Sequence, residues 1–419
     1  MRWVTDYAGT YCDQAGKKTD TEYELHTPNT REHGMAPQNR SGSRTGTLTH
    51  CQGSRPRAAG GIVCGHLLKI IRERIPLTQS RLAEGLGIDT TTVQGWESGR
   101  RSLTAVSSTQ FLRLKRHLLG RGAEATLLPL LDLAVEADAV IEYSLDDTLD
   151  GDDITQHPLH SWVFTRASTH MITWALTGEQ PTVLPKAPTS TPRRRGPTPD
   201  SPLLPAPDRE RLFANLRRTA EIADRAGERG SLLRRQALYL CAYDTSADAH
   251  SWLADMQERR PMPLRHASWT PAWSDARSVA TSLIRYGDIE TLQAFIERGM
   301  GADASEMANL NYWAHWLGLD PVPRASDAFM SDIDGQSWEA LPLLRALADR
   351  LDPSRGAVDL NIHSVWALIS SKPGVLSADL DLHRDLTARV GRLLDSDAIS
   401  RQSRRELDNV HYGLRLSSR

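Results

Sequence analysis

The stretch from Leu77 to Arg101, LTQSRLAEGLGIDTTTVQGWESGRR, constrains the fold of this chain more than any other part of it. Its pattern predicts two short helices joined by a tight turn. Thr78 and Asp89 each precede a helical pattern and can cap it through a side-chain oxygen. Gly87 stands between the two patterns, where a positive φ is needed and glycine adopts it at little steric cost.

The second predicted helix has one inward and one outward face. Val93 and Trp96, three positions apart, are expected to point into a core. The outward positions are uncharged, and they are Thr90, Thr91, Gln94 and Gly95. Glutamine can form two hydrogen bonds to adenine, and threonine can offer a hydroxyl or a methyl group to a base. Arg100 and Arg101 follow, where they can meet phosphate. An ordinary pair of amphipathic helices is the alternative, but the whole order of caps, turn and basic end favours a helix-turn-helix.

Several positions between about residues 65 and 119 carry a family resemblance. They are Leu68, Arg72, Leu77-Thr78-Gln79, Leu82-Ala83, Gly87-Ile88 and Trp96-Glu97-Ser98-Gly99-Arg100. This pattern resembles the phage-repressor-like (Xre/Cro/CI type) helix-turn-helix family of transcriptional regulators. The resemblance implies a lambda-repressor-like bundle of four or five helices, with the third helix in the DNA major groove. The long helical C-terminal region expected here resembles those of many actinobacterial regulators of this type.

The resemblance also implies roles for individual residues. The expected DNA contacts are Gln79 at the backbone and first bases, Thr90, Thr91 and Gln94 at base edges, and Thr92 and Arg100 at phosphates. The family pattern further implies a structural ion pair between Arg72 and Glu97. Gly95 departs from the pattern, because a side chain often contacts DNA at that position.

Charge is distributed unevenly along the chain. Residues 62–122 contain ten Lys or Arg and four acidic residues, in a chain whose net charge is −2. Such a local basic surface is typical of a small DNA-binding module. From Ala123 to Thr165 there are ten acidic residues and no Lys or Arg. One interpretation of these acids is a face that repels DNA and keeps its contacts to one side of the module. The acidic run 146–153 lacks the spacing of a calcium loop, which favours a solvated loop.

Composition limits the other functional classes. A length of 419 residues is enough for two or three domains, and a 39% hydrophobic content can supply their cores. The cysteines lack metal-site spacing, and they are Cys12, Cys51, Cys64 and Cys241. We expect reduced thiols, no metal and no cofactor. No apolar run is long enough to cross a bilayer and no signal peptide is visible, so we expect no membrane association and a cytoplasmic, nucleoid-associated location.

The composition shifts predict five segments. They are a disordered polar extension over 1–61, the helix-turn-helix domain over 62–122, an acidic helical connector over 123–180, a proline-rich linker over 181–207 and a helical C-terminal domain over 208–419. Whether residues 1–61 belong to the natural protein is left open, with Met35 or Val63 as alternative starts. A basic arm that touches DNA is another interpretation of this extension. Nine prolines make the linker extended, and Arg193 to Arg195 within it are either solvated or near phosphate.

The last half of the chain has a helical pattern throughout, so the predicted fold class is all-α. The expected helices are Asp208–Arg229, Leu232–Tyr243, Ala247–Arg260, Ala272–Tyr286, Ile289–Arg298, Ser305–Leu317, Gln336–Leu351, Leu360–Ser371, Ala378–Leu394 and Ser400–Leu416. A further helix is expected over Ser161–Gly178. Short helices and short turns suggest stacked helix pairs, tetratricopeptide-like or solenoid-like only in a loose sense.

One of these helices carries the chain's densest polar and aromatic cluster. Asn311, Trp313 and His315 could line a groove for a small-molecule or peptide effector. Core packing is the alternative for each of these side chains.

The sequence thus predicts a sequence-specific regulator that binds a double-stranded DNA operator. We expect a homodimer, with the C-terminal half serving dimerisation or effector sensing. A DNA-bound scaffold of a plasmid, phage or defence system, recruiting protein partners, is the rival interpretation. No catalytic motif occurs in a plausible context, so an enzyme is not expected.

Overall fold

The computed structural model describes residues 60–146, 154–185, 201–260, 269–332, 337–354 and 356–417. Within these ranges the chain forms helices and no strand, which confirms the all-α prediction. The predicted extension before residue 60, most of the acidic loop and the arginines 193–195 lie outside them. No helix in these ranges is both long enough and apolar enough to cross a bilayer.

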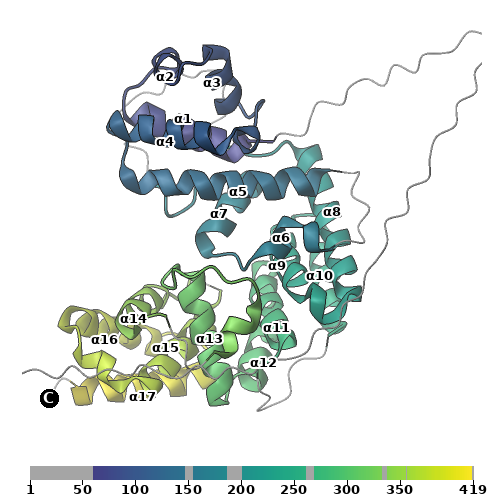
Figure 1. Cartoon of the computed structure of the whole chain (residues 1–419). Coiled ribbons are helices and arrows are strands. Elements are labelled where there is room, and N and C mark those ends of the chain that lie inside the picture. Colours follow the sequence, from purple (N-terminus) through teal and green to yellow (C-terminus); the bar gives the residue numbers. More distant parts are fainter. Residues whose placement is uncertain are drawn as a thin grey trace, which may run out of the picture. The chain divides into compact units, whose positions relative to one another are not determined.

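The helices of the first half follow the helix-turn-helix pattern and then extend it. They are α1 (Ile62–Arg74), α2 (Gln79–Leu86), α3 (Thr90–Glu97), α4 (Ser108–Gly120), α5 (Leu128–Leu145), α6 (Pro158–Ser161) and α7 (Arg166–Thr177). Single 3-10 turns are η1 (Leu103–Ala105), η2 (Ala125–Leu127) and η3 (Ile154–Gln156). Helix α1 packs against α3 and α5, and α2 packs against α3 and α4 (Figure 1).

Local hydrogen bonds explain where the two central helices begin. The Thr78 Oγ1 accepts the Arg81 N–H at 3.2 Å, and the Asp89 carboxylate accepts the Thr91 N–H at 2.7 Å. Gly87 ends α2 with a φ of 66°, the left-handed conformation that suits glycine. The sequence-based assignment of both caps and of the turn is confirmed.

Helix α5 continues the core of the N-terminal helices. It contacts α1, α7 and α8 (Ala206–Arg225), and one apolar cluster extends from Val63 in α1 to Leu283 in α11 (Pro271–Leu283). The Asp138 carboxylate of α5 accepts the N–H groups of Val63 at 2.9 Å and Cys64 at 2.8 Å. A carboxylate from α5 therefore caps the N-terminus of α1, which has no cap of its own.

The segment Ser161–Gly178 differs from the single helix that its sequence predicts. The chain is extended at Trp162, whose side chain is 45% exposed, and α7 begins only after Thr165. The Val163 N–H donates to the Arg324 carbonyl at 2.7 Å instead of to a helical carbonyl. Because the Val163 N–H forms a tertiary hydrogen bond, it is not available for a helical one, and the helix is interrupted.

The described ends of the proline-rich segment pack against α7. Leu184 and Leu204 are buried, and the Leu204 N–H donates to the Ala175 carbonyl at 2.9 Å. Helix α8 begins at Ala206, inside the segment that the sequence assigns to the linker.

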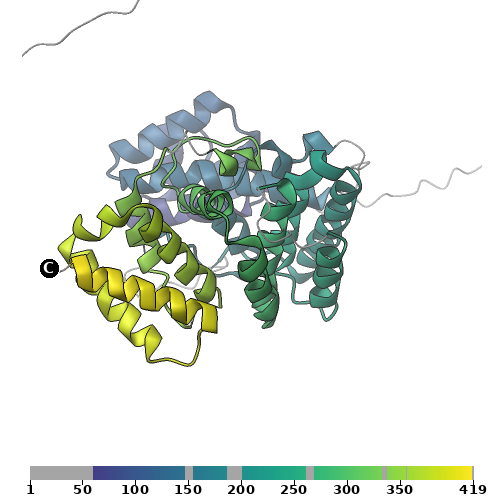
Figure 2. The same ribbon diagram turned by 90° about the horizontal axis from the view of Figure 1, so that it is seen from below.

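The remaining helices agree with the ten that the sequence predicts. After α8 they are α9 (Ser231–Cys241), α10 (Ala249–Glu258), α11 (Pro271–Leu283), α12 (Glu290–Gly299), α13 (Asp303–Trp316), α14 (Ala340–Ala348), α15 (Val358–Ser371), α16 (Leu380–Leu394) and α17 (Arg401–Ser417). The 3-10 turns are η4 (Gly227–Gly230), η5 (Ile284–Tyr286), η6 (Asp327–Ser331) and η7 (Pro373–Ser377). Pairs such as α8 with α9 and α16 with α17 lie side by side (Figure 2).

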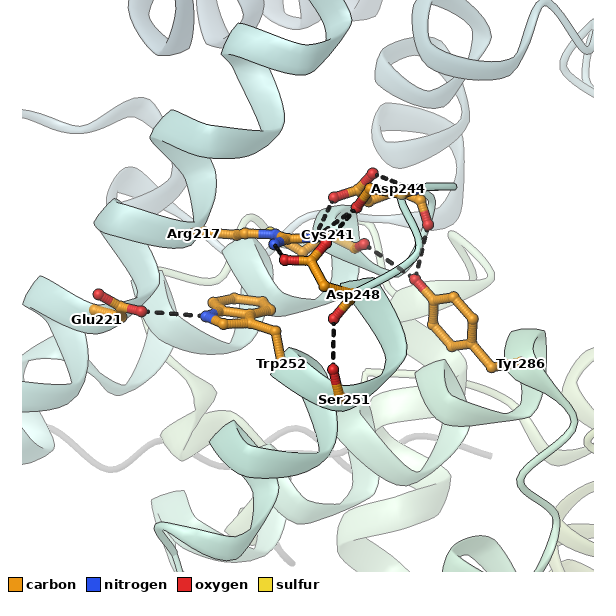
Figure 3. A network of polar contacts seen from close by, with 9 residues as sticks. Arg217, Glu221, Cys241, Asp244, Asp248, Ser251, Trp252 and Tyr286 are labelled. Atoms are coloured by element: carbon orange, nitrogen blue, oxygen red, sulfur yellow. Dashed lines mark hydrogen bonds and ion pairs between the residues drawn. The ribbon is translucent and has the colours of Figure 1, made fainter.

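Ionic networks fix the helices around α9. Arg234 is fully buried and pairs with Asp224 and Asp275, so it joins three helices through one guanidinium group. A neighbouring network begins at Arg217 of α8, which pairs with Asp244 at 2.6 Å and Asp248 at 2.8 Å (Figure 3).

The same Arg217 guanidinium lies 5.2 Å from the ring centre of Trp252, whose indole N–H donates to Glu221 (Figure 3). These contacts hold α10 against α8. Both terminal nitrogens of the Arg217 guanidinium bind acidic side chains of the protein, so we assign the network to the fold.

Candidate nucleic-acid interface

The outer face of α3 presents the uncharged side chains that the sequence singles out. Thr91 and Gln94 are exposed and Thr90 is half-buried, while Val93 and Trp96 are buried beneath them. Within the described residues the Gln94 amide has no hydrogen-bond partner, so its donor and acceptor remain available to a ligand. This is the arrangement that direct reading of base edges requires.

Arg101 lies across α3 where Gly95 leaves room. Its Nη1 donates to the Thr92 Oγ1 at 3.1 Å, and a Cβ built on Gly95 would lie 3.0 Å from the Arg101 Cδ. The Arg101 N–H also donates to the Gly95 carbonyl at 3.0 Å. The missing side chain at position 95 therefore allows an arginine from after the helix to occupy its outer face.

Arg72 and Glu97 form the ion pair that the resemblance implies. Arg72 Nε lies 2.5 Å from Glu97 Oε1 and Arg72 Nη2 lies 2.9 Å from Glu97 Oε2, with both residues buried. The Gln79 Nε2 donates to the same carboxylate at 2.6 Å. The pair thus joins α1 to α3 and also holds the first residue of α2. Gln79 is half-buried, and its amide nitrogen is directed toward the protein.

The basic side chains near α5 differ from those beside α3. Those toward α5 are neutralised: Lys115 pairs with Asp132 at 2.7 Å and Arg74 with Glu124 at 3.0 Å. Arg100 and Arg101, beside α3, are exposed and make no ion pair within the described part of the chain. Positive charge without a carboxylate partner in these ranges is therefore present beside Gln94.

Two residues that sequence reasoning did not single out position this surface. A Cβ on Gly65 of α1 would lie 1.9 Å from the Trp96 carbonyl oxygen, so only glycine permits this approach of α1 to α3. Asp138 caps α1 from α5, and burial raises the pKa of this carboxyl to about 6. A glycine within an apolar helical pattern, and an acid within the apolar stretch 127–141, were the available signals.

The expected effector groove is not open at the residues proposed for it. Asn311, Trp313 and His315 are buried. The Trp313 indole donates to Ser364 Oγ at 2.9 Å, and the His315 Nε2 lies 3.0 Å from the Val163 carbonyl oxygen.

Asn311 is equally enclosed, because its Nδ2 donates to the Met330 carbonyl and its Oδ1 accepts the Trp338 indole N–H. Burial lowers the pKa of His315, which keeps this histidine neutral. The three side chains therefore belong to an interior hydrogen-bond network, in agreement with the alternative that they pack in the core.

Comparison with known proteins agrees with the geometry over a short region. Residues 68–106 match a family model described as helix-turn-helix, which covers less than a tenth of the chain. This match identifies the segment around α2 and α3 as a DNA-binding domain of that class. Searches of curated proteins and of solved structures found no match.

Proposed function

We propose that this protein is a sequence-specific, DNA-binding transcriptional regulator. The observation that carries the proposal is the outer face of α3, where exposed Gln94 and Thr91 adjoin two arginines; among the described residues Gln94 has no hydrogen-bond partner and the arginines no ion pair. In this proposal α3 enters the major groove, and Thr90, Thr91 and Gln94 contact base edges.

Phosphate contacts surround this reading face in the proposal. Arg100 and the Thr92–Arg101 pair bind the DNA backbone beside α3, since both arginines are exposed. Gln79 adds a backbone contact through its exposed part, while its amide nitrogen remains on Glu97. Such contacts position the protein on DNA and provide most of the salt-dependent affinity.

A single module of this size contacts few base pairs, so we propose a homodimer on a two-fold operator. The half-site centres would lie about 34 Å apart, one turn of B-DNA. The C-terminal helices would provide dimerisation or effector sensing.

The test is binding of the full chain to a fluorescent duplex about three helical turns long, carrying random sequence. Anisotropy should show saturable binding that weakens steeply between about 50 and 200 mM salt, because phosphate contacts release counterions. A chain that leaves duplex DNA unbound even at the low salt concentration contradicts the proposal.

A further inference from the structure

An open hollow of about 470 Å³ lies between the C-terminal end of α12 and the first turns of α17. Its volume falls in the range of small-molecule sites, roughly 300–1,000 Å³. The lining residues are Glu297, Arg298, Met300, Gly301, Arg401, Gln402 and Arg405. It shares no residue with α3 or with the buried Asn311 network.

Three arginines surround the hollow without a carboxylate partner. Arg298, Arg401 and Arg405 are exposed and form no ion pair within the described ranges. The neighbouring Arg404, by contrast, uses its guanidinium to donate to the Leu394 and Ser396 carbonyls at 2.5 and 2.7 Å. The positive charge at the hollow is therefore available to a ligand.

The placement of two of these arginines is unfavourable for an isolated helix. Arg401 and Arg405 are four residues apart on α17, and like charges at this spacing destabilise a helix by about 0.2–0.5 kcal/mol. Both also lie in the first turns, where the helix dipole favours negative charge. An anion bound between the two arginines would be attracted by both guanidinium groups and by the positive end of the helix dipole, so both unfavourable interactions would become favourable ones.

The α17 wall of the hollow is held in place by other contacts. The Ser403 N–H donates to Ser400 Oγ at 3.1 Å, and the Ser400 N–H donates to Asp359 at 3.0 Å. The Gln402 Nε2 donates to Glu406 at 2.9 Å, and this carboxylate also contacts His363 Nδ1. The arginines thus project from a backbone that is anchored before any ligand arrives.

We propose that this hollow binds an anionic small molecule through phosphate or carboxylate oxygens. Arg298 approaches the ligand from α12, and Arg401 and Arg405 approach it from α17, so planar guanidinium groups from two helices share its charge. Glu297 is the one acid of the lining, and it opposes anion binding unless the ligand offers a hydroxyl or amine to it.

The test is calorimetric titration of the full chain with pyrophosphate, and separately with citrate, in the absence of DNA. Saturable binding of pyrophosphate identifies phosphate as the preferred group, and saturable binding of citrate identifies carboxylate. The double variant Arg401→Gln/Arg405→Gln should lose at least tenfold in affinity. Arg392, an exposed arginine of α16, has no partner in the part of the chain that the structure describes, so Arg392→Gln is the matched control and should bind like the parent.

Glu297→Gln should shift the affinity for pyrophosphate, which has no alcohol hydroxyl or amine, in the opposite direction, since it removes the opposing carboxylate while leaving every arginine in place. A several-fold tighter binding is expected. Thermal unfolding checks each variant's fold, and the double variant should be as stable as the parent because the removed charges are exposed and repel each other. Absence of saturable binding by both ligands, or equal affinity in parent and double variant, overturns the proposal. Since no DNA is present, its failure is distinct from a failure of DNA recognition.

Discussion

Gly65 of α1 and Trp96 of α3 approach so closely that a Cβ at position 65 would lie 1.9 Å from the Trp96 carbonyl oxygen. The obstacle is backbone, which cannot move aside by a rotamer change. The helix that carries the proposed DNA contacts therefore depends on a residue without a side chain, on a different helix.

Gly65→Ala should force α1 away from α3 and destabilise the N-terminal helices by about 3 kcal/mol, the upper range for overpacking. Hydrogen exchange measured by mass spectrometry should show a loss of protection over residues 62–122. The loss of protection in α12–α17 should be smaller. Gly120→Ala is the control, because no atom lies within 4 Å of the Cβ it would add. Unchanged protection in Gly65→Ala would mean that α1 and α3 are not packed as described.

Gly95→Ala separates stability from DNA binding. Alanine within a helix is more favourable than glycine by roughly 0.5–1 kcal/mol, so the melting temperature should not fall. The new Cβ would nevertheless lie 3.0 Å from the Arg101 Cδ and displace that side chain from α3. Duplex affinity should fall several-fold by anisotropy. In an Arg101→Ala background the same change should have no further effect, and an undiminished effect there would show that Arg101 is not the residue displaced.

Arg100→Ala tests the proposed phosphate contact. Loss of one such contact should weaken binding to all duplex sequences alike and reduce the slope of log affinity against log salt by about 0.9. Lys115→Ala provides the comparison, because Lys115 is already neutralised by Asp132 at 2.7 Å and should leave the slope unchanged. A loss confined to one DNA sequence would instead assign Arg100 to base reading.

Asp138 should make the stability of the N-terminal helices depend on pH. Burial raises the pKa of its carboxyl from 3.8 to about 6. A carboxyl with a higher pKa in the folded state stabilises when protonated, and this contribution is lost as pH rises through the folded value. The free energy of unfolding should therefore fall by about 3 kcal/mol from this group between about pH 4 and 7.

The difference in the free energy of unfolding between the parent and Asp138→Asn isolates the contribution of Asp138. His157 and His170, whose pKa values burial lowers to about 4, change stability in the opposite direction but are common to both proteins. Hydrogen exchange of α1 at several pH values should show the parent losing stability relative to Asp138→Asn as pH rises. A constant difference would mean that Asp138 stays ionised throughout.

The sequence predicted features whose causes are local. The caps at Thr78 and Asp89, the Gly87 turn and the ten C-terminal helices depend on neighbouring residues and on hydrophobic periodicity. The Arg72–Glu97 pair followed from a family resemblance.

Features set by distant residues could not be predicted in this way. The break at Trp162 arises because Val163 bonds a carbonyl 161 positions away, and the α1 cap comes from Asp138. The polar cluster around Asn311 suggested a groove, yet Trp338 and Met330 satisfy that side chain in the interior. Composition alone does not distinguish a satisfied polar core from a binding surface.

The central claim is that Gln94 of α3 reads a base, and selection of bound duplexes from a random pool tests it most directly. The parent and Gln94→Ala should enrich the same sequence except at one position in each half-site, where the variant loses its preference at a cost of about 1–3 kcal/mol. Gln110→Ala, in α4, should select the parent's sequence throughout. Enrichment of identical sequences by the parent and Gln94→Ala, or no enrichment at all, would contradict the account.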